Sequence, residues 1–321
     1  MRCDRCSTEA VRFAPYSGAH LCANHFCRSV EKRVRHRVRE DNLIPTDASP
    51  EAPVTWVIGL SGGKDSAVLT HILHETFERD PRIDLFALTI HEGIEGYRDE
   101  SLEACKRLAG ERDIRHEIAS YDEEFSIAMD DVVEQDRSMA ACAYCGVFRR
   151  DVLERRASDL GADLLLTGHN LDDEAQTALM NFLSGDLTQI AKHHEASLGG
   201  LHERATNSPF TPRAKPLRDV PEKEVALYAR LRELPAHITE CPHASGAYRG
   251  EIQELLLALE DNHPGTRHSI MSGYEELAAR LAAEKTPTTQ DELTECDSCE
   301  ALTVHDVCRS CQLLTELQMS G

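Results

Sequence analysis

Val54-Thr55-Trp56-Val57-Ile58-Gly59-Leu60 runs directly into Ser61-Gly62-Gly63-Lys64-Asp65-Ser66, and this stretch decides the fold. Its first half is apolar and rich in β-branched residues, which predicts a buried strand. The glycines that follow let backbone N–H groups approach an anion closely, and a helix expected over residues 66–78 adds its N-terminus to that site. The loop is neither a Walker A sequence nor a dinucleotide fingerprint, because both glycine spacings are absent.

Strand and helix patterns alternate through the rest of the central region. Alternating β and α units with apolar strands predict an α/β fold built on a doubly wound parallel sheet. We expect strands at residues 54–60, 85–91, 115–119, 163–167 and 214–217. We expect helices at residues 66–78, 99–111, 123–134, 147–160, 172–183, 221–234, 250–260 and 272–283.

The composition is that of a globular protein. The chain has 321 residues, 41% apolar and 28% charged, which allows one large core with appendages or two domains. No run approaches the roughly 20 apolar residues of a membrane span, and residues 1–4 lack the apolar core of a signal peptide. We therefore expect a cytoplasmic protein with no membrane partner, whose reduced cysteines bind metal more often than they form disulfides.

Charge is distributed unevenly along the chain. Lys and Arg total 35 against 56 Asp and Glu, a net charge of −21. Residues 1–40 hold nine basic and four acidic residues, a net of +5, so the remainder carries −26. Only seven of the basic residues are lysines, and an acidic, lysine-poor chain is typical of salt-adapted archaeal proteins. The acidity therefore does not exclude a nucleic-acid partner, because high salt screens the repulsion.

A basic helix is predicted near the N-terminus. Val30, Val34 and Val38 recur every four residues within 28–39, with arginines between them. This helix is either a solvated linker or a nucleic-acid contact. A proline-rich linker follows at 45–53. The expected segments are an N-terminal zinc finger at 1–27, the basic helix and linker at 28–53, the α/β domain at 54–283, and a linker with a C-terminal zinc finger at 284–321.

Two cysteine clusters at the chain ends predict structural zinc sites. The spacings are those of paired zinc knuckles, and four protein ligands leave no open position for chemistry. The N-terminal ligands are expected to be Cys3, Cys6, Cys22 and His25, with Cys27 as the competitor of His25. The C-terminal ligands are expected to be Cys296, Cys299, Cys308 and Cys311.

A third cysteine group lies in the middle of the chain. Cys142-x2-Cys145 and the distant Cys241 are compatible with a redox, zinc or iron–sulfur role. Cys105 lies in an amphipathic helical pattern and is expected to be a small buried apolar residue.

These motifs together resemble a known family. Ser-Gly-Gly-Lys-Asp-Ser after a first strand resembles the pyrophosphate loop of the PP-loop ATP pyrophosphatases. Cys142-Ala143-Tyr144-Cys145-Gly146, Gly168-His169-Asn170-Leu171-Asp172-Asp173-Glu174 and Cys241-Pro242, with zinc modules at both ends, resemble the tRNA 2-thiouridine synthetases of the TtuA/NcsA family. The resemblance covers essentially the whole chain. The TtcA cytidine thiolases lack the paired zinc modules, and the lysidine synthetases lack this cysteine set.

The resemblance implies a set of site residues. Cys142, Cys145 and Cys241 would bind a [4Fe–4S] cluster with one iron open to sulfide, whereas a cluster-free route would use Cys142 and Cys241 for a persulfide. Asp173, with Asp172 as its rival, would be the catalytic or magnesium-linked carboxylate, and His169 and Asp172 are alternatively helix-capping residues. ATP with Mg2+ would be bordered by Gly59, Ser61, Gly62, Gly63, Lys64, Asp65, Ser66, His91, Arg149 and Gly168.

The implied activity is ATP-dependent thiolation of tRNA. The uridine C2 oxygen would attack the α-phosphorus of ATP, and sulfur would then displace AMP. Zinc modules and the basic helix would hold tRNA. A ubiquitin-like sulfur-carrier protein and a homodimer are further implications. The wobble uridine is expected, with the T-loop uridine as the alternative. A nitrogen-transferring PP-loop tRNA ligase and a non-enzymatic zinc-ribbon RNA-binding protein are the other functional hypotheses.

Overall fold

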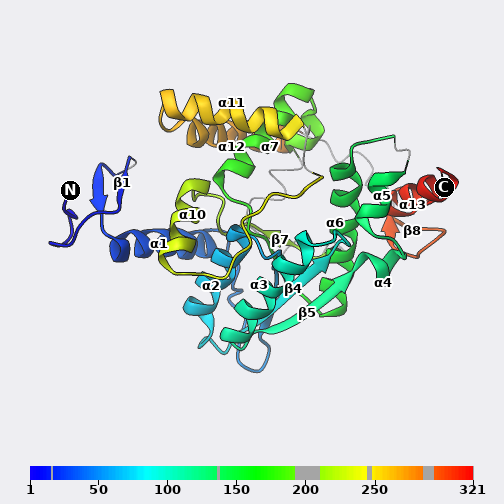
Figure 1. Ribbon diagram of the computed structural model, residues 1–321, viewed down its shortest axis with the longest axis horizontal. Coiled ribbons are helices and arrows are strands. Elements are labelled where there is room, and N and C mark those ends of the chain that lie inside the picture. Colours follow the sequence, from blue (N-terminus) through cyan, green and yellow to red (C-terminus); the bar gives the residue numbers. More distant parts are fainter. Residues whose placement is uncertain (16, 136–137, 192–209, 244–247, 285–292, 321) are drawn as a thin grey trace.

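The computed structural model describes residues 1–15, 17–135, 138–191, 210–243, 248–284 and 293–320. A parallel five-stranded sheet lies at its centre, in the order β5-β4-β3-β6-β7 (Figure 1). Its strands are β3 (Val54–Gly59), β4 (Ile83–His91), β5 (Arg115–Ser120), β6 (Leu164–Leu166) and β7 (Arg213–Ala214). Two short antiparallel hairpins belong to the chain ends: β1 (Arg12–Ala14) with β2 (Ala19–Leu21), and β8 (Thr294–Glu295) with β9 (Leu302–Thr303).

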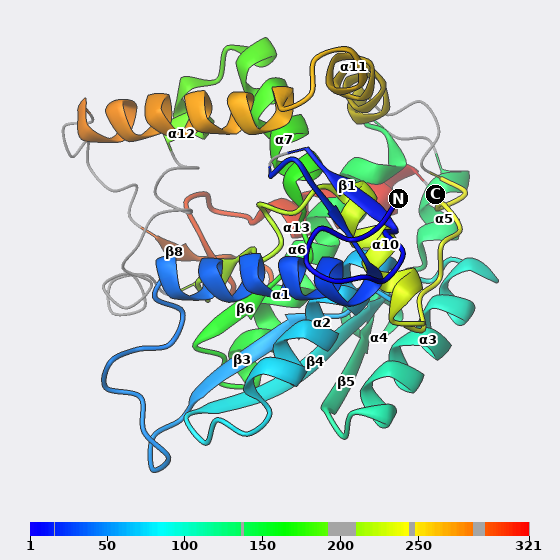
Figure 2. The ribbon, with the colours of Figure 1, turned by 90° about the vertical axis from the view of Figure 1, so that its left-hand side faces the viewer.

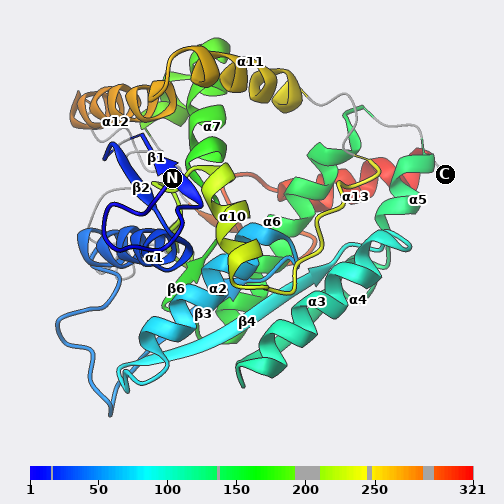
Figure 3. The ribbon, with the colours of Figure 1, turned by 60° about the vertical axis from the view of Figure 1, so that its left-hand side comes forward.

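Helices pack on both faces of this sheet (Figures 2 and 3). The helices of the described residues are α1 (Ala23–Glu40), α2 (Lys64–Phe77), α3 (Tyr97–Glu111), α4 (Tyr121–Phe125), α5 (Met129–Glu134), α6 (Ala141–Asp159), α7 (Leu171–Ser184), α10 (Glu222–Leu231), α11 (Tyr248–Asn262), α12 (Thr266–Glu284) and α13 (Arg309–Ser320). Side chains of β3 alternate between the two layers. Trp56 and Ile58 join the core under α1, α2 and α10, whereas Val57 joins the core under α6 and α13. The predicted doubly wound α/β fold is therefore confirmed.

The order of the strands creates a crevice beside β3. The chain passes from β3 outward to β4 and β5, and then returns across β3 to β6 and β7. Ligands of open α/β sheets bind outside the carboxyl ends of the strands at such a reversal. The loops after β3 and β6 meet at this position, so the fold places the phosphate loop at the expected crevice.

Helix α1 belongs to the core. Its three valines are fully or almost fully buried in the same cluster as Trp56 and Tyr228. Helix α1 also packs against α10 and α2. The predicted basic helix therefore packs onto the α/β unit as part of α1, which begins at Ala23, and does not stand away from it.

Several helices differ from the sequence-based expectation. Helix α12 begins at Thr266 and not at 272, and α13 was not expected. The helix expected at 123–134 is divided into α4 and α5, because Ser126 adopts a left-handed φ of 54° that ends α4. The helix expected to begin at 147 begins at Ala141, so both cysteines of the CxxC motif lie inside α6. Gly146 does not end the helix, because Tyr144 and Phe148 on either side are fully buried and anchor it.

Helices α7, α11 and α12 form a separate small core at one end of the molecule (Figure 1). The linker expected at 284–295 includes residues 285–292, which lie outside the described residues. None of the helices in the described ranges combines the length and the apolar character needed to cross a membrane.

Candidate functional site

The phosphate loop connects the carboxyl end of β3 to the first turn of α2. The hydroxyl of Ser66 accepts a hydrogen bond from the Ser61 N–H at 3.1 Å and donates to the Gly63 carbonyl at 3.0 Å, which ties the two ends of the loop together. Gly63 is the N-cap of α2 and offers no side chain to the first N–H groups of the helix. These N–H groups are therefore available to an anion.

Two glycines are required by close contacts. Gly62 has a φ of 84°, and a Cβ there would lie 2.3 Å from the Ser101 carbonyl oxygen. A Cβ on Gly168 would lie 2.9 Å from the backbone of Asp65 and Ser66. Gly168 thus allows the loop after β6 to touch the backbone of the phosphate loop.

A cavity of about 290 Å³ lies between these two loops. Its apolar part is formed by Leu60, Leu88, Ile90 and Leu153. Most of the predicted ATP-site residues line it: Gly59, Ser61, Asp65, Ser66, Arg149 and Gly168, together with Asp173. One part of the cavity is therefore apolar and suited to the base of a nucleotide. The other part is the loop suited to its phosphates.

The structure distinguishes the two candidate aspartates. Asp173 lines the cavity, and burial, together with the charge of Asp65, raises its pKa to about 6. Asp172 lies elsewhere, paired with Arg267 at 2.6 Å and accepting from the Glu222 N–H at 2.9 Å. Of these two aspartates, Asp173 is thus the one that can reach a ligand in the cavity.

Neither His169 nor Asp172 caps helix α7. The N-cap is Asn170, whose side-chain oxygen accepts from the N–H groups of Asp172 and Asp173 at 2.9 and 3.2 Å. The amide nitrogen of Asn170 donates to Asp65 at 2.9 Å. Asn170 therefore connects the two loops of the site, a role that sequence reasoning missed. His169 lines the cavity, and burial lowers its pKa to about 4.

Four predicted residues lie apart from the cavity lining. Lys64 pairs with Asp65 at 3.0 Å and with Glu222 at 2.8 Å. His91 ends β4, with its Nε2 3.9 Å from Asp99. Gly62 and Gly63 shape the loop without lining the cavity.

A buried ion network extends from the phosphate loop to the central cysteines. Glu92, 3% exposed, pairs with both Arg98 and Arg149. Arg98 donates to the Ser61 carbonyl at 2.7 Å, and Arg149 donates to the Cys145 sulfur at 3.2 Å. Sequence reasoning missed Glu92 and Arg98, although Glu92 follows the carboxyl end of β4 directly.

The three central cysteines belong to one region of the structure. The Cys142 thiol donates to the His243 carbonyl at 3.5 Å, two residues after Cys241, and Cys145 and Cys241 pack in the same apolar cluster. Burial raises the pKa of both Cys145 and Cys241. Cys145 is buried, Cys241 is half-buried and Cys142 is exposed. Among the described side chains, the sulfurs of Cys142, Cys145 and Cys241 do not all lie within 4.8 Å of one another. A cluster with several irons binds each thiolate to a different iron, so its ligands need not converge as those of a single ion do. The donor set therefore fits an iron–sulfur cluster.

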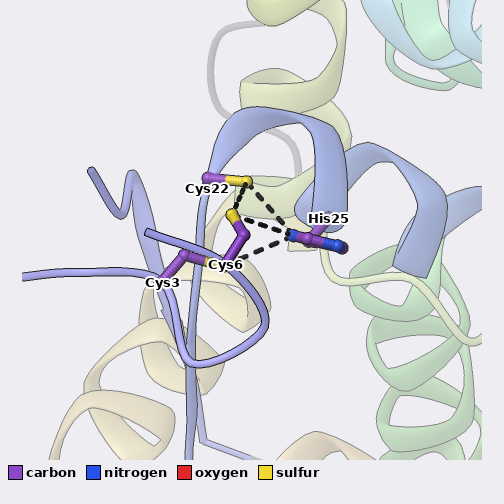
Figure 4. A group of neighbouring side chains, drawn as sticks. All are labelled: Cys3, Cys6, Cys22 and His25. Atoms are coloured by element: carbon purple, nitrogen blue, oxygen red, sulfur yellow. Dashed lines mark hydrogen bonds between the residues drawn. The ribbon is translucent and has the colours of Figure 1, made fainter. Parts of the chain in front are cut away.

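The four predicted N-terminal ligands point toward one another (Figure 4). His25 Nδ1 lies 3.4, 3.6 and 3.3 Å from the sulfurs of Cys3, Cys6 and Cys22. The Cys6 and Cys22 sulfurs are 3.7 Å apart. Zn–S bonds of about 2.3 Å in a tetrahedron give an S–S distance of about 3.8 Å, so the site fits one zinc ion. Cys27 is packed in the core instead.

The C-terminal cysteines form a matching group. Cys296, Cys299, Cys308 and Cys311 converge within 4.8 Å, and the sulfurs of Cys299 and Cys308 are 3.7 Å apart. This geometry also fits one tetrahedral zinc ion. Cys105 is fully buried outside all of these groups, as expected.

Comparisons with known proteins agree with this site. A family model of the PP-loop domain matches residues 30–238, and a model of the N-terminal LIM domain of the 2-thiouridine synthetase TtuA matches residues 2–27. The tRNA 2-thiolation protein NcsA of Haloferax volcanii is 67% identical over 319 residues, which is 99% of each chain. Cytoplasmic tRNA 2-thiolation protein 1 of Mus musculus is 38% identical over 97% of this chain and 71% of its own length.

A solved structure is similar over nearly the whole chain. It is the U34-tRNA thiolase NcsA from Methanococcus maripaludis with its [4Fe–4S] cluster, which matches with a TM-score of 0.79 and 31% identity over 99% of this chain and 96% of that chain. The resemblance drawn from the loop and cysteine motifs is thereby confirmed. The chain belongs to the family of PP-loop tRNA 2-thiolation enzymes that includes NcsA and TtuA.

Proposed function

We propose that the protein uses ATP to convert a tRNA uridine to 2-thiouridine, releasing AMP and pyrophosphate. The observation that carries this proposal is the position of Arg149. Its side chain lines the cavity of the phosphate loop and donates to the sulfur of Cys145. One residue therefore borders both the site suited to nucleotide activation and the site suited to sulfur.

The first step would activate the uridine. The uridine C2 oxygen attacks the α-phosphorus and pyrophosphate leaves, so that this oxygen becomes bonded to AMP. The N–H groups at the start of α2 and the Arg149 guanidinium stabilise the developing negative charge. Asp173 would bind Mg2+ together with the phosphates, because it lines the cavity and carboxylate oxygens are ligands that Mg2+ prefers.

The second step would exchange oxygen for sulfur. A sulfur nucleophile bonds to C2, and the C2–O bond breaks as AMP departs with the original oxygen. Cys142, Cys145 and Cys241 would hold a [4Fe–4S] cluster, which supplies an open iron to carry sulfide. The similar thiolase from Methanococcus maripaludis is described with such a cluster, which favours this route over a persulfide on Cys142 and Cys241.

The wobble position is the proposed target. The structure matched over 99% of this chain is described as a U34-tRNA thiolase, which supports the wobble uridine over the T-loop uridine. We also propose a zinc ion in each terminal module, a homodimer, a ubiquitin-like sulfur-carrier protein as sulfur donor, and a cytoplasmic location. The last agrees with the name of the mouse relative.

Helix α1 offers a surface for the tRNA backbone, because its cations divide into two sets. Arg33 pairs with Glu224, and Arg37 pairs with Asp219 at 2.6 Å, so these two serve the fold. A second set has no ion pair within the described ranges and follows a helical stripe on the other side: Arg28, Lys32, Arg35 and Arg39. In an otherwise acidic protein this stripe would contact phosphates.

Removal of charge from the stripe should weaken tRNA binding in a salt-dependent way. The double variant Arg28→Gln/Lys32→Gln should lower the slope of log affinity against log salt by about two, one for each phosphate that is no longer neutralised. Arg33→Gln is the matched control on the same helix and should leave the slope unchanged while lowering stability. Equal slopes for the double variant and the wild type would remove α1 from the tRNA interface.

The proposed reaction is tested by anaerobic reconstitution. Protein loaded with iron and sulfide, given ATP and unmodified tRNA, should form 2-thiouridine and AMP in equal amounts. Cys142→Ala, Cys145→Ala and Cys241→Ala should each abolish thiolation, whereas the matched control Cys105→Ala should not. An iron-free active enzyme would favour nitrogen transfer. Absence of any tRNA-dependent AMP formation would favour a non-enzymatic RNA-binding protein.

A further inference from the structure

The end of helix α6 that carries the CxxC motif has no cap of its own. Its N-cap residue is Ala140, which has no side-chain acceptor, and its first turn contains no acidic residue. The first N–H groups of a helix need partners, and an uncapped end frays. Cys142 and Cys145 lie in this first part of the helix, so their geometry depends on what else stabilises it.

A carboxylate from the C-terminal helix lies at this end. Glu316 of α13 accepts a hydrogen bond from the Tyr144 hydroxyl, and also from the Ser138 N–H at 3.1 Å. Tyr144 lies between the two cysteines in the sequence, and its side chain is fully buried. These donors hold the pKa of Glu316 below its usual range, so the carboxylate is charged at neutral pH. A negative charge at a helix N-terminus is stabilising.

The rest of α13 reinforces this contact. Leu313 and Leu317 are buried in the same cluster as Tyr144, Cys145 and Phe148. Figures 1 and 3 show α13 alongside α6.

Helix α13 begins at Arg309, between two of the cysteines in the C-terminal group. Cys308 precedes it and Cys311 lies in its first turn. The predicted zinc module and the helix that contacts α6 are therefore one continuous unit.

We propose that Glu316 is a positioning residue through which the C-terminal module anchors the start of α6, at Ser138 and Tyr144, and fixes the place of Cys142 and Cys145. The link to iron binding rests on the proposed function, whereas the anchoring of α6 does not. In this arrangement the C-terminal metal site supports the central cysteine site without contributing a ligand to it.

Hydrogen exchange on the full-length, cluster-free protein tests this anchoring. Glu316→Ala should speed amide exchange in residues 138–146 about fivefold, the factor that corresponds to the loss of about 1 kcal/mol of hydrogen bonding. Tyr144→Phe should have a similar effect, and the double variant should add little. Gln318→Ala, an exposed position on the same helix, is the matched control and should leave these amides unchanged.

Two outcomes would overturn the proposal. One is unchanged exchange in residues 138–146 in both Glu316→Ala and Tyr144→Phe. The other is an equal acceleration in β3, which would mean that the variants only lower global stability.

Iron retention supplies the second readout. Reconstituted Glu316→Ala should lose iron to a chelator about fivefold faster than wild type, and so should Cys299→Ser, which breaks the C-terminal metal site. Iron loss at the wild-type rate in both variants would refute the link to the cluster. If the wild type binds no iron but the exchange effect is present, the anchoring of α6 stands and the cluster in the proposed function fails.

Discussion

Replacement of Gly168 by alanine tests the geometry of the nucleotide site most directly. The added Cβ would lie 2.9 Å from the backbone of Asp65 and Ser66, whereas an ordinary contact begins at 3.4 Å. The phosphate loop and the loop after β6 must therefore separate by about 0.5 Å, because backbone atoms cannot move aside as a flexible side chain can. The two loops that form the walls of the cavity would then no longer hold their positions relative to each other.

The expected loss of nucleotide affinity follows from this shift. A misplacement of about 1 Å can cost about a hundredfold in a site that positions a ligand, so half of that distance should cost about tenfold. Gly110→Ala is the matched control, because a Cβ at this position on α3 has nothing within 4 Å. It should stabilise the helix by about 0.5–1 kcal/mol and leave nucleotide binding unchanged.

Isothermal titration of cluster-free protein with a non-hydrolysable ATP analogue and Mg2+ measures both variants. Thermal denaturation on the same samples verifies that each is folded. Binding of the analogue by Gly168→Ala with wild-type affinity would refute the assignment of this cavity to the nucleotide. A tenfold loss in Gly110→Ala would refute the steric reasoning.

Three further outcomes are expected. His25→Ala should lower the zinc content by one ion per chain, whereas Cys27→Ala should leave it unchanged; equal zinc contents by elemental analysis would contradict the ligand assignment. Glu92→Ala should lower the free energy of unfolding by about 3–5 kcal/mol in urea titrations, because it leaves the buried Arg98 without its carboxylate; a loss below about 1 kcal/mol would show that the network contributes little. Burial, together with Arg112, lowers the pKa of His71 to about 4, below its unfolded value of 6.5, so the unfolded chain binds the extra proton first. The stability that depends on neutral His71 is therefore complete above about pH 6.5 and is lost as the pH falls toward 4. His71→Gln should flatten the dependence of the free energy of unfolding on pH in this range. An unchanged dependence would contradict this reasoning.

Local motifs in the sequence were sufficient for much of the site. The strand, the glycine loop and the start of α2 are contiguous, so their arrangement follows from short-range geometry. The predicted zinc ligands also come in short pairs, and the choice of His25 over Cys27 followed from matching spacings. The structure agrees because Cys27 lies on the face of α1 that packs into the core.

The expectations that changed depended on contacts from elsewhere. The sequence predicted a start at 147 for this helix, whereas α6 begins at Ala141, where the burial of Tyr144 and Phe148 anchors its first turns. The role of the arginines on α1 likewise depended on Asp219 and Glu224, which lie far away in the sequence. A helical pattern shows where a charge lies on a helix but not which acid faces it.

The α/β fold, the phosphate loop and the two terminal cysteine groups could be predicted from the sequence, because their patterns and motifs are formed by residues close together in the chain. Tertiary packing was needed to show that Asp173 and not Asp172 faces the cavity. It also showed that Glu92 connects the loop to Cys145, and that Glu316 lies at the end of α6. These relations join segments up to 178 residues apart, and the packing of the sheet and helices alone brings them within hydrogen-bond distance.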